Sequence, residues 1–416
     1  MLSRRTYLKA VPLGLAASTL TTRPAAADTG AIPAAASAVR AFTADLYRTL
    51  AATTAATTTT GNLVCAPYSV AVALAMARVG AAGSTGDEMD AVLHAPEPRP
   101  DALHPALGAL DRLLAAYDDP GGTGAVTPRM STANALWPQV DLALRPQFVD
   151  TLSTCYAAAP HPVDFLHAPE PARQEINAWV SQRTAGRIPQ LLSDGSISAA
   201  TSLVLTNAIS LKAAWLFPFP KAATTQGAFT TAAGTTVSTP MMAVPGRMLG
   251  YRDGGTWHAV RLPYVGGTLA MTVVVPRSGQ LADLEATIDE TWLRSLLTGF
   301  STRTVQVRLP RWNLRQPTDL TGGLTGLGLR TAFTIQADFT AMCPVLGTHL
   351  DRVAHEAFIA VDEDGTEAAG ASAVVVVPPQ LPTPVIADRP FLYVIHDIAT
   401  ATPLFIGRVG DPTSGT

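Results

Sequence analysis

The chain has 416 residues, 47% of them hydrophobic and 15% charged, with a formal net charge of −3. This length allows one large domain or two to three ordinary ones with ample material for a core, and the lack of a basic excess argues against nucleic acid as a partner. The three cysteines, Cys65, Cys155 and Cys343, are odd in number and far apart, which argues against a disulfide framework or a metal site, so we expect neither a metal nor another cofactor.

The N-terminus predicts an export signal. Residues 3–9 (SRRTYLK) match a twin-arginine pattern, the apolar run Ala10–Leu20 follows, and Ala25–Ala27 offers a cleavage site. The alternative is an ordinary secretory signal with a chance pair of arginines. We expect residues 1–27 to be removed, 28–33 to form a linker, and a soluble bacterial protein to be secreted, because no later run reaches the roughly 18 apolar residues of a membrane helix.

The first half of the chain predicts mainly helices. Apolar residues at helical spacing mark them, and a Thr-rich and a Pro-rich run interrupt them. In chain order we expect a helix over Ala34–Ala52, a flexible loop over Thr53–Thr60, a helix over Tyr68–Val79, a helix capped by Thr85 that runs towards Leu93, a break at Pro96–Pro100, a strand over Thr132–Trp137, an amphipathic helix over Pro171–Thr184 and a strand over Ser202–Leu211.

From Val237 onward the pattern predicts mostly strands, which are apolar runs bounded by Gly and Pro. We expect strands over Ala259–Pro263, Leu269–Val275 and Val305–Leu309, a short helix over Asp319–Leu329, and a hairpin of Phe391–Asp397 and Pro403–Val409. Helices come first and strands later without βα alternation, which indicates an α+β fold. No composition break divides the chain, so we expect a single domain over residues 34–412 and a short tail over 413–416.

The segment 363–390 (EDGTEAAGASAVVVVPPQLPTPVIADRP) combines features that rarely occur together. A polar turn, Glu363–Gly365, precedes a run of small and then β-branched residues, Thr366–Val377, whose composition favours a strand. A proline-rich connector follows. A strand-forming run with such small side chains at its start is weakly anchored, which indicates a strand that can move.

This segment resembles the reactive-centre loop of the serpins, and further motifs of that family follow one another along nearly the whole chain. The loop match is GTEAAGASA, which His355-Glu-Ala-Phe precedes and Arg389-Pro-Phe-Leu closes. The other motifs are Asn62–Ser69 with the helix after it, TANALW at Thr132–Trp137, Leu205–Ile209 with Lys212 and Trp215–Phe219, Leu262–Tyr264, Leu309–Arg311, and Phe405–Val409 with Pro412.

The resemblance implies mainly antiparallel sheets, namely a large central sheet A and two smaller ones, with about eight or nine helices and an exposed loop over 363–390. In the family this loop is presented to a protease as a substrate. Once cut, it inserts into the central sheet and carries the protease along as a covalent acyl-enzyme. The resemblance therefore implies an inhibitor of serine, or also cysteine, proteases that is not itself an enzyme, and we expect it to act as a monomer.

The resemblance also assigns roles to particular residues. Ser69, Asn207 and His355 match the shutter, a polar cluster beneath the point where the central sheet opens. Such a cluster lets two buried strands separate without leaving unpaired donors in an apolar core. The alternative is that each is an ordinary buried polar residue or a cap. Ala66 stands where the family usually has a second serine, so one hydroxyl of the cluster is missing.

Trp215, Arg311 and Glu363 match the breach, where the loop first enters the sheet. We expect Glu363 and Arg311 to face each other and to delay premature insertion, whereas two solvated charges would contribute little. The hinge at the start of the loop consists of small or turn-forming residues around two acids, namely Glu363, Gly365, Thr366, Glu367, Ala368, Ala369, Gly370 and Ala371.

The loop pattern suits insertion as a strand. Side chains alternate by two, so Thr366, Ala368, Gly370 and Ser372 share one small, uncharged face and Glu367 lies on the other. Pro378 lacks the N–H that a central strand needs, so insertion should stop near Val377. The family's usual spacing from Glu363 places the reactive bond at Pro379–Gln380, and a small shift would move it to Val377 or Pro378. A prolyl-specific, elastase-like or subtilisin-like protease is the expected target.

Two other functions are open to this sequence. A non-inhibitory serpin would keep the fold and act as a binding or carrier protein, although its hinge would usually hold bulky or charged residues. A secreted hydrolase would need a nucleophile elbow or a metal motif. The chain has no GxSxG, and the pair His355-Glu356 lacks the second histidine of HExxH because residue 359 is Ile.

Overall fold

The computed structural model describes residues 31–57, 60–96, 102–115, 128–277, 280–366 and 381–414. Within these ranges nine α-helices and fourteen strands combine into an α+β fold, as the sequence predicts. The helices are α1 (Ala31–Thr57), α2 (Pro67–Arg78), α3 (Gly83–Val92), α4 (Leu103–Ala115), α5 (Pro146–Tyr156), α6 (Pro169–Arg183), α7 (Leu281–Glu285), α8 (Glu290–Thr298) and α9 (Thr321–Gly326).

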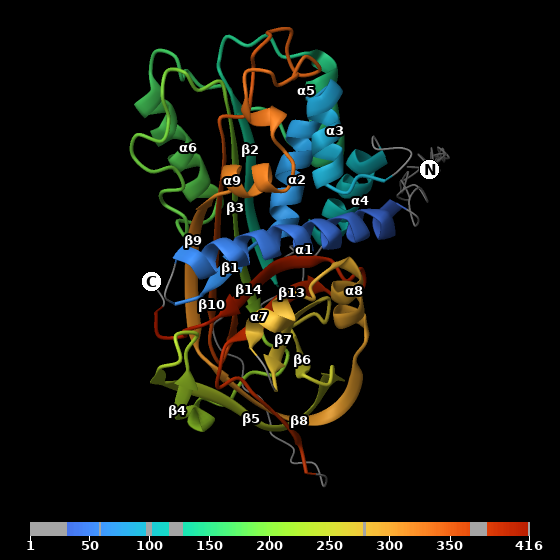
Figure 1. Cartoon of the computed structure of the whole chain (residues 1–416), viewed down its shortest axis with the longest axis vertical. Coiled ribbons are helices and arrows are strands. Elements are labelled where there is room, and N and C mark those ends of the chain that lie inside the picture. The colour runs from blue at the N-terminus through green and yellow to red at the C-terminus, as the bar shows by residue number, and fades with distance from the viewer. Residues whose placement is uncertain are drawn as a thin grey trace, which may run out of the picture.

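A five-stranded sheet runs along the long axis of the molecule (Figure 1), and we call it the long sheet. Its order is β2 (Arg129–Pro138), β3 (Leu203–Ala214), β11 (Gly365–Thr366), β10 (Arg352–Val361) and β9 (Trp312–Asp319). β3 and β10 are parallel and pair directly over most of their length, whereas every other pair in the sheet is antiparallel.

A nine-stranded sheet fills the other half of the molecule. Its strands are β1 (Leu63–Cys65), β4 (Thr225–Thr230), β5 (Thr236–Asp253), β6 (Trp257–Pro263), β7 (Leu269–Pro276), β8 (Ser301–Pro310), β12 (Thr383–Ile386), β13 (Phe391–Asp397) and β14 (Pro403–Val409). The resemblance leads us to expect two smaller sheets here. The described strands form one hydrogen-bonded network because the 18-residue β5 pairs with β4, β6 and β8.

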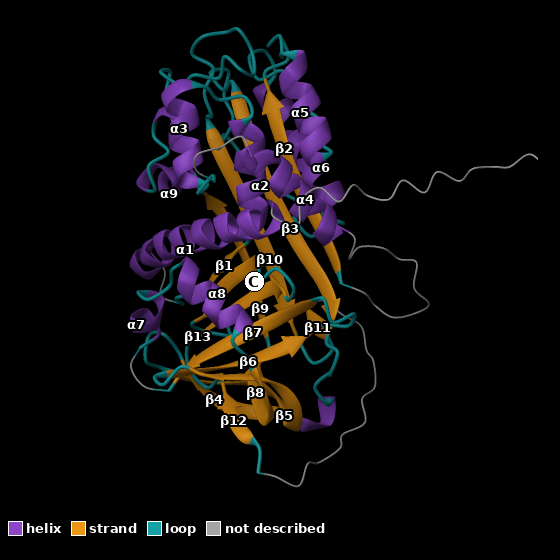
Figure 2. Ribbon diagram, turned by 90° about the vertical axis from the view of Figure 1, so that its right-hand side faces the viewer, coloured by secondary structure: helices purple, strands orange, loops and turns teal. Residues whose placement is uncertain are grey.

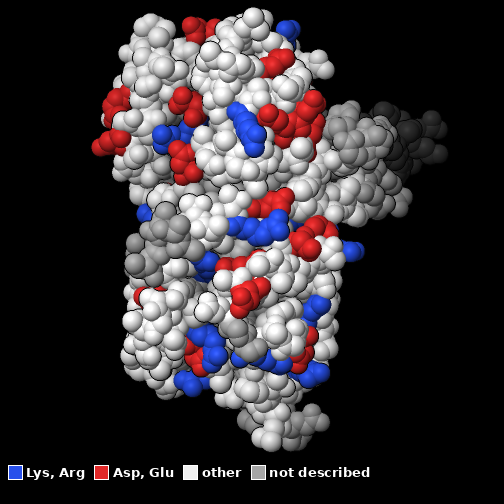
Figure 3. Space-filling model, in the orientation of Figure 1, with Lys and Arg blue, Asp and Glu red and all other residues white. Residues whose placement is uncertain are grey.

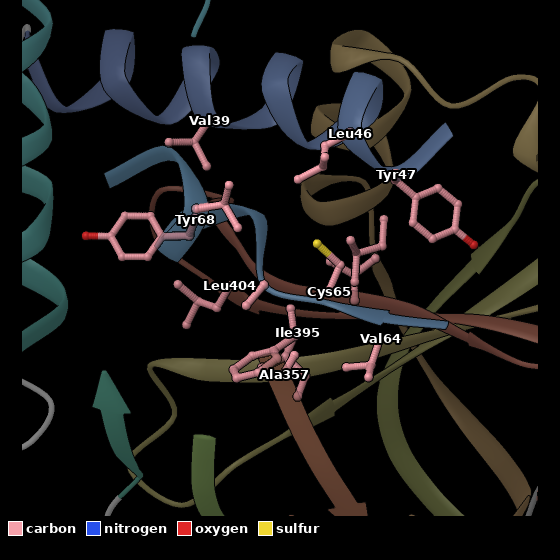
Figure 4. Close-up of a cluster of buried hydrophobic side chains, with 14 of the residues drawn as sticks. Val39, Leu46, Tyr47, Val64, Cys65, Tyr68, Ala357, Ile395 and Leu404 are labelled. Atoms are coloured by element: carbon pink, nitrogen blue, oxygen red, sulfur yellow. The ribbon is translucent and has the colours of Figure 1, made fainter. Parts of the chain in front are cut away.

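The main core lies where the two sheets and the helices meet. α1 crosses the middle of the molecule (Figure 1), and apolar side chains beneath it fill the space down to β10 (Figure 4). The buried residues labelled there are Val39, Leu46, Tyr47, Val64, Cys65, Tyr68, Ala357, Ile395 and Leu404. Burying a side chain of this size stabilises the fold by about 1.5–3 kcal/mol, so this layer holds the two halves together.

A second, smaller core lies on the opposite face of the long sheet. α6 and the segment after it cover this face, while α2 covers the other (Figure 2). Apolar residues of α6 such as Ile176 and Val180 pack with Trp137 of β2 and with Ala208 of β3. Small residues on β3 and β10 therefore lie beneath α6, at the line where the two parallel strands meet.

The strongest periodic patterns predict their elements well. The hairpin of β13 and β14 has the expected bounds, and α6 begins and ends close to the expected residues. The expected flexible loop over Thr53–Thr60 is wrong over its first five residues, because α1 continues to Thr57. Within the helix, Thr53 Oγ1 donates to the carbonyl of Thr49 at 3.0 Å.

The predicted cap of α3 is also wrong. Thr85 lies inside the helix, and the N-cap is Ala82, whose side chain makes no cap hydrogen bond. The Thr85 hydroxyl instead accepts a hydrogen bond from the backbone N–H of Asp338 at 2.9 Å. It is fully buried and ties α3 to the loop before β10.

Charged side chains of both signs are mixed over the face shown in Figure 3. None of the helices in the described ranges is long and apolar enough to cross a membrane.

Candidate functional site

The short strand β11 lies between β3 and β10 at one end of the long sheet. Gly365 pairs with Ala214, and Thr366 pairs with Ala213 on one side and Val361 on the other. Below this point β3 and β10 pair with each other, from Phe358 opposite Ser210 onward. The first residues of the loop therefore already occupy the gap where a further strand would enter the sheet.

Gly365 is required by this geometry. Its φ is +154°, and a Cβ at this position would lie 2.1 Å from the carbonyl oxygen of Ala213. Only glycine adopts such a backbone conformation readily. The close approach lets the chain turn from β10 into the gap within a few residues.

Two aromatic side chains, Trp215 and Tyr264, pack beneath β11. The hydroxyls of Tyr264 and Thr366 lie 2.7 Å apart, and both residues are fully buried. The ring of Trp215 stacks on that of Tyr264 with 4.5 Å between centroids and an angle of 8°. Trp215 Nε1 donates to the carbonyl of Asp362 at 3.0 Å. The predicted breach residue thus contacts the turn at the base of the loop.

Glu363 lies buried beside this turn, with 2% of its side chain exposed. Arg311 donates to Oε1 of Glu363 from Nη2 at 2.6 Å and from Nε at 3.0 Å, and Thr224 Oγ1 donates to the same oxygen at 2.5 Å. Burial raises the pKa of this carboxyl, but the hydrogen bonds from Arg311 and Thr224 outweigh burial and leave the pKa below its ordinary value. The structure therefore brings the two charges together as a buried carboxylate and its cation.

We expect Glu363→Ala to lower the free energy of unfolding by about 1–2 kcal/mol, because Arg311 and Thr224 lose their acceptor. The uncleaved chain should then inactivate and polymerise at a lower temperature, which native gels after stepwise warming would measure. Lys221→Ala is the matched control, since its ion pair with Asp364 is formed by a lysine that is 69% exposed and should contribute little. Equal behaviour of the two variants would contradict the assigned role of Glu363.

The three predicted shutter residues meet in one hydrogen-bonded cluster between β3, β10 and α2. Nδ2 of Asn207 lies 2.6 Å from Ser69 Oγ, and Oδ1 of Asn207 lies 2.5 Å from His355 Nδ1. Asn134 of β2 completes the cluster, because its Oδ1 accepts from Asn207 at 2.6 Å and from Ser69 at 2.8 Å. Asn207 and His355 are direct register partners, so separating β3 from β10 must break their hydrogen bond.

The serine that Ala66 replaces is not needed to complete the cluster. The backbone N–H of Ala66 donates to His355 Nε2 at 3.3 Å, so Nε2 is the acceptor and Nδ1–H donates to Asn207. Both nitrogens of a neutral imidazole are thereby used. Burial lowers the pKa of His355 to about 4, which keeps the ring in this neutral form at physiological pH.

Glu356 is a buried carboxyl on the α6 face of β10, one residue after His355. Its side chain is 3% exposed, and its Oε1 lies 3.7 Å from Nε of Arg315 on β9. Arg315 also donates from Nη2 to the carbonyl of Arg187, at 2.5 Å, in the segment that follows α6. Burial raises the pKa of Glu356 to about 7, although Arg315 opposes this effect.

The raised pKa of Glu356 predicts that the free energy of unfolding depends on pH. An unshifted glutamate titrates near 4.5 and Glu356 near 7. Between these values the folded chain binds more protons than the unfolded chain, so this carboxyl destabilises the fold increasingly as the pH rises from 4.5 to 7. We expect Glu356→Gln to raise the free energy of unfolding by about 2 kcal/mol at pH 8 and by almost nothing near pH 4.5.

The matched control for this measurement is Glu175→Gln, which changes an exposed carboxyl on α6. Denaturant unfolding of wild type and both variants at several pH values gives the comparison. A Glu356→Gln effect that is the same at every pH would mean that packing, and not ionisation, is responsible.

Part of the predicted site lies outside the described residues. These are the hinge residues Glu367, Ala368, Ala369, Gly370 and Ala371 and the candidate reactive positions Val377, Pro378, Pro379 and Gln380. Sequence reasoning missed Asn134, Thr224 and Tyr264 as members of the site. Two of these had a usable signal, since Asn134 stands in TANALW and Tyr264 ends Leu262-Pro-Tyr. Within the described ranges, no group of three or more His, Cys, Asp or Glu side chains is placed to hold a metal ion.

Comparison with known proteins places the chain in a family. Residues 37–412 match the family model described as "Serpin (serine protease inhibitor)". An uncharacterized serpin-like protein of Thermococcus kodakarensis is 34% identical over 91% of this chain and 86% of its own length. Leukocyte elastase inhibitor A of Rattus norvegicus is 32% identical over 89% of this chain and 97% of its own length.

Solved structures agree with this assignment. Serpin48 of the insect Tenebrio molitor, described as a highly specific serpin, superposes with a TM-score of 0.78 and 28% identity over 91% of this chain and 98% of that one. Uncleaved ovalbumin gives a TM-score of 0.79 at 24% identity, over 91% of this chain and 100% of that one, which is a likeness of fold. The family model spans most of the sequence and relatives above 30% identity cover nearly all of it, so the chain belongs to the serpin family.

Proposed function

We propose that this serpin inhibits serine proteases, or alternatively cysteine proteases, as a suicide substrate. The protease cuts the loop after about Pro379, and residues Thr366–Val377 then enter the long sheet between β3 and β10. The observation that supports this most directly is the position of β11, which already pairs with both strands at the end where the gap begins. The acyl-enzyme is trapped because the loop carries the protease along when it moves.

The energy for this step comes from strand pairing. An inserted strand of about a dozen residues gains hydrogen bonds on both sides and breaks the direct pairing of β3 with β10, and at roughly 1 kcal/mol per bond the net gain is on the order of 10 kcal/mol. That is comparable to the whole stability of an ordinary domain. The uncleaved chain is therefore metastable, and cleavage releases the stored energy.

The names of the relatives support a choice of first targets. Several of the similar proteins are leukocyte elastase inhibitors, and the valine run before Pro378 suits an elastase-like or subtilisin-like protease.

We also propose that the protein works outside the cell as a monomer after twin-arginine export, because residues 3–9 match that signal.

The test is to mix the mature chain with elastase, subtilisin, trypsin and a prolyl-specific protease. We expect an SDS-resistant complex with at least one of them, and sequencing of the released C-terminal peptide should place the cut within 377–380. A chain that every protease degrades as an ordinary substrate, without a complex and without a gain in heat resistance, would instead be a non-inhibitory binding or carrier serpin.

A further inference from the structure

A cavity of about 480 Å³ lies in the half of the molecule that the nine-stranded sheet fills. It opens between α7, the turn that joins β4 to β5, and the residues just before β13. Its volume falls in the range of about 300–1,000 Å³ that small-molecule sites usually have. None of its described lining residues belongs to the breach or to the shutter, so it is separate from the site of loop entry.

A buried ion pair lies at the bottom of this cavity. Arg408 of β14 donates from Nη1 to both carboxylate oxygens of Glu285 on α7, at 3.0 and 2.8 Å, and each side chain is 9% exposed. Nε of Arg408 donates to the carbonyl of Gly61, and the hydroxyl of Tyr47 donates to Glu285 at 2.5 Å. The two charges neutralise each other, and because both are already buried, a molecule that covers them removes little water from them.

Arg389 stands at the entrance of the cavity, with 49% of its side chain exposed. Its Nε donates to Oδ1 of Asp388 at 2.8 Å. No other group in the described ranges accepts a hydrogen bond from this guanidinium, so the N–H groups of Nη1 and Nη2 are open to another partner. Glu285, the one acidic residue among the described lining residues, is already paired. The entrance therefore offers hydrogen-bond donors to a ligand.

Small residues keep the cavity open. Ala232 and Gly234, in the turn between β4 and β5, line one side, and Ala282 of α7 lines another. A Cβ at Gly234 would meet no atom within 4 Å. Leu281 and Pro390 add apolar surface to the walls. A ligand can thus contact apolar groups and backbone here without displacing a large side chain.

We propose that this cavity binds a small organic carboxylate with an apolar body, such as a medium-chain fatty acid. The carboxylate accepts a bidentate pair of hydrogen bonds from Nη1 and Nη2 of Arg389, the geometry in which a guanidinium matches a carboxylate. The apolar body lies against Leu281 and Pro390 and covers the ion pair at the bottom of the cavity.

Other small ligands match these groups less well. A cation would meet Arg389 at the entrance and would find Glu285 already bonded to Arg408 and Tyr47. Inorganic phosphate would gain an ion pair with a half-exposed arginine, which contributes little, and would leave the apolar walls uncovered. The apolar body must therefore supply most of the affinity, while the carboxylate fixes the orientation of the ligand.

The first experiment titrates the uncleaved chain with hexanoate, octanoate and decanoate below their micelle concentrations, followed by NMR and calorimetry. We expect the affinity to rise about two- to fourfold for each added CH₂ group. Octanamide has the same chain without the charge and should bind about fivefold more weakly than octanoate. Inorganic phosphate should not displace octanoate.

A second experiment locates the site with paired variants. Ala282→Trp and Ala232→Phe place a large side chain on facing walls of the cavity, and each should abolish octanoate binding. Ala199→Trp adds the same indole to an exposed alanine of the loop before β3 and should bind as the wild type does. Two wall variants are used so that one result remains if the other chain does not fold, which circular dichroism would show.

A third comparison tests the charge at the entrance. Arg389→Gln should lower the affinity for octanoate about fivefold and leave that for octanamide unchanged. Arg294→Gln removes an exposed cation of α8 and should alter neither.

Three results would overturn the proposal, namely no binding of octanoate or decanoate by the wild type, equal affinities for octanoate and octanamide, or undiminished binding by a folded wall variant. No protease enters these measurements, so their outcome does not depend on whether the chain inhibits one. A chain that forms no complex with any protease can still bind octanoate in this cavity, and an inhibitory chain can fail to do so.

Discussion

Replacing Asn207 with alanine is expected to lower the free energy of unfolding of the uncleaved chain by about 3 kcal/mol or more. The side chain holds Ser69, Asn134 and His355 together, and each buried polar group that loses its partner costs about 1–3 kcal/mol. Denaturant unfolding would measure the loss. Because Asn207 and His355 join β3 to β10, the variant should also polymerise at temperatures that the wild type withstands.

Asn177→Ala is the control that separates an opened sheet from a general loss of stability. Asn177 is a buried amide on α6 that hydrogen bonds to the backbone N–H and carbonyl of Leu192, away from the line between β3 and β10. We expect this variant to lose stability without gaining polymers. If both variants polymerise alike, the cluster around Asn207 has no special part in keeping the sheet closed.

Gly365→Val should have the second largest effect and should expel β11 from the gap. The new side chain would meet the backbone of Ala213, and the positive φ costs a residue other than glycine about 1–3 kcal/mol. Loss of the β11 pairs with β3 and β10 adds to this. We expect a lower unfolding temperature and, after cleavage, a much slower gain in heat resistance.

Gly255→Val provides the comparison for backbone strain alone. Gly255 also has a positive φ, of +78°, but a Cβ there would meet no atom within 4 Å. It should destabilise the chain without slowing insertion. An equal delay in both variants would mean that strain anywhere in the chain slows insertion, and that the close approach of Gly365 to β3 is not the cause.

The sequence predicts an element best where the element's own residues determine it. The hairpin of β13 and β14 consists of continuous apolar runs, and its bounds match the prediction. The low-complexity run Thr53–Thr60 predicts a loop, yet its first five residues continue α1, which ends at Thr57. The sequence did not predict that β5 joins β4, β6 and β8 into one sheet, because these pairings link residues far apart in the chain and leave no local pattern.

The same distinction decides which residues of the site the sequence could predict. Residues with a family motif, such as Ser69, Asn207 and His355, could be named in advance, and they lie together. Asn134 stands in the TANALW motif but was missed, because the motif alone does not show that the register of β2 and β3 brings this residue opposite Asn207. The burial of Glu363 and the raised pKa of Glu356 depend on what covers them, and this follows only from the folded chain.

The fluorescence of Trp215, which stacks on Tyr264, can report movement at the base of the loop. Indole emission is sensitive to its polar neighbours, and Trp215 is one of six tryptophans in the chain. Its N–H is bonded to the carbonyl of Asp362 at the base of the loop, so any movement of that turn changes the surroundings of this ring. Comparing the wild type with Trp215→Phe would isolate its signal and time the first step of loop entry without an attached dye.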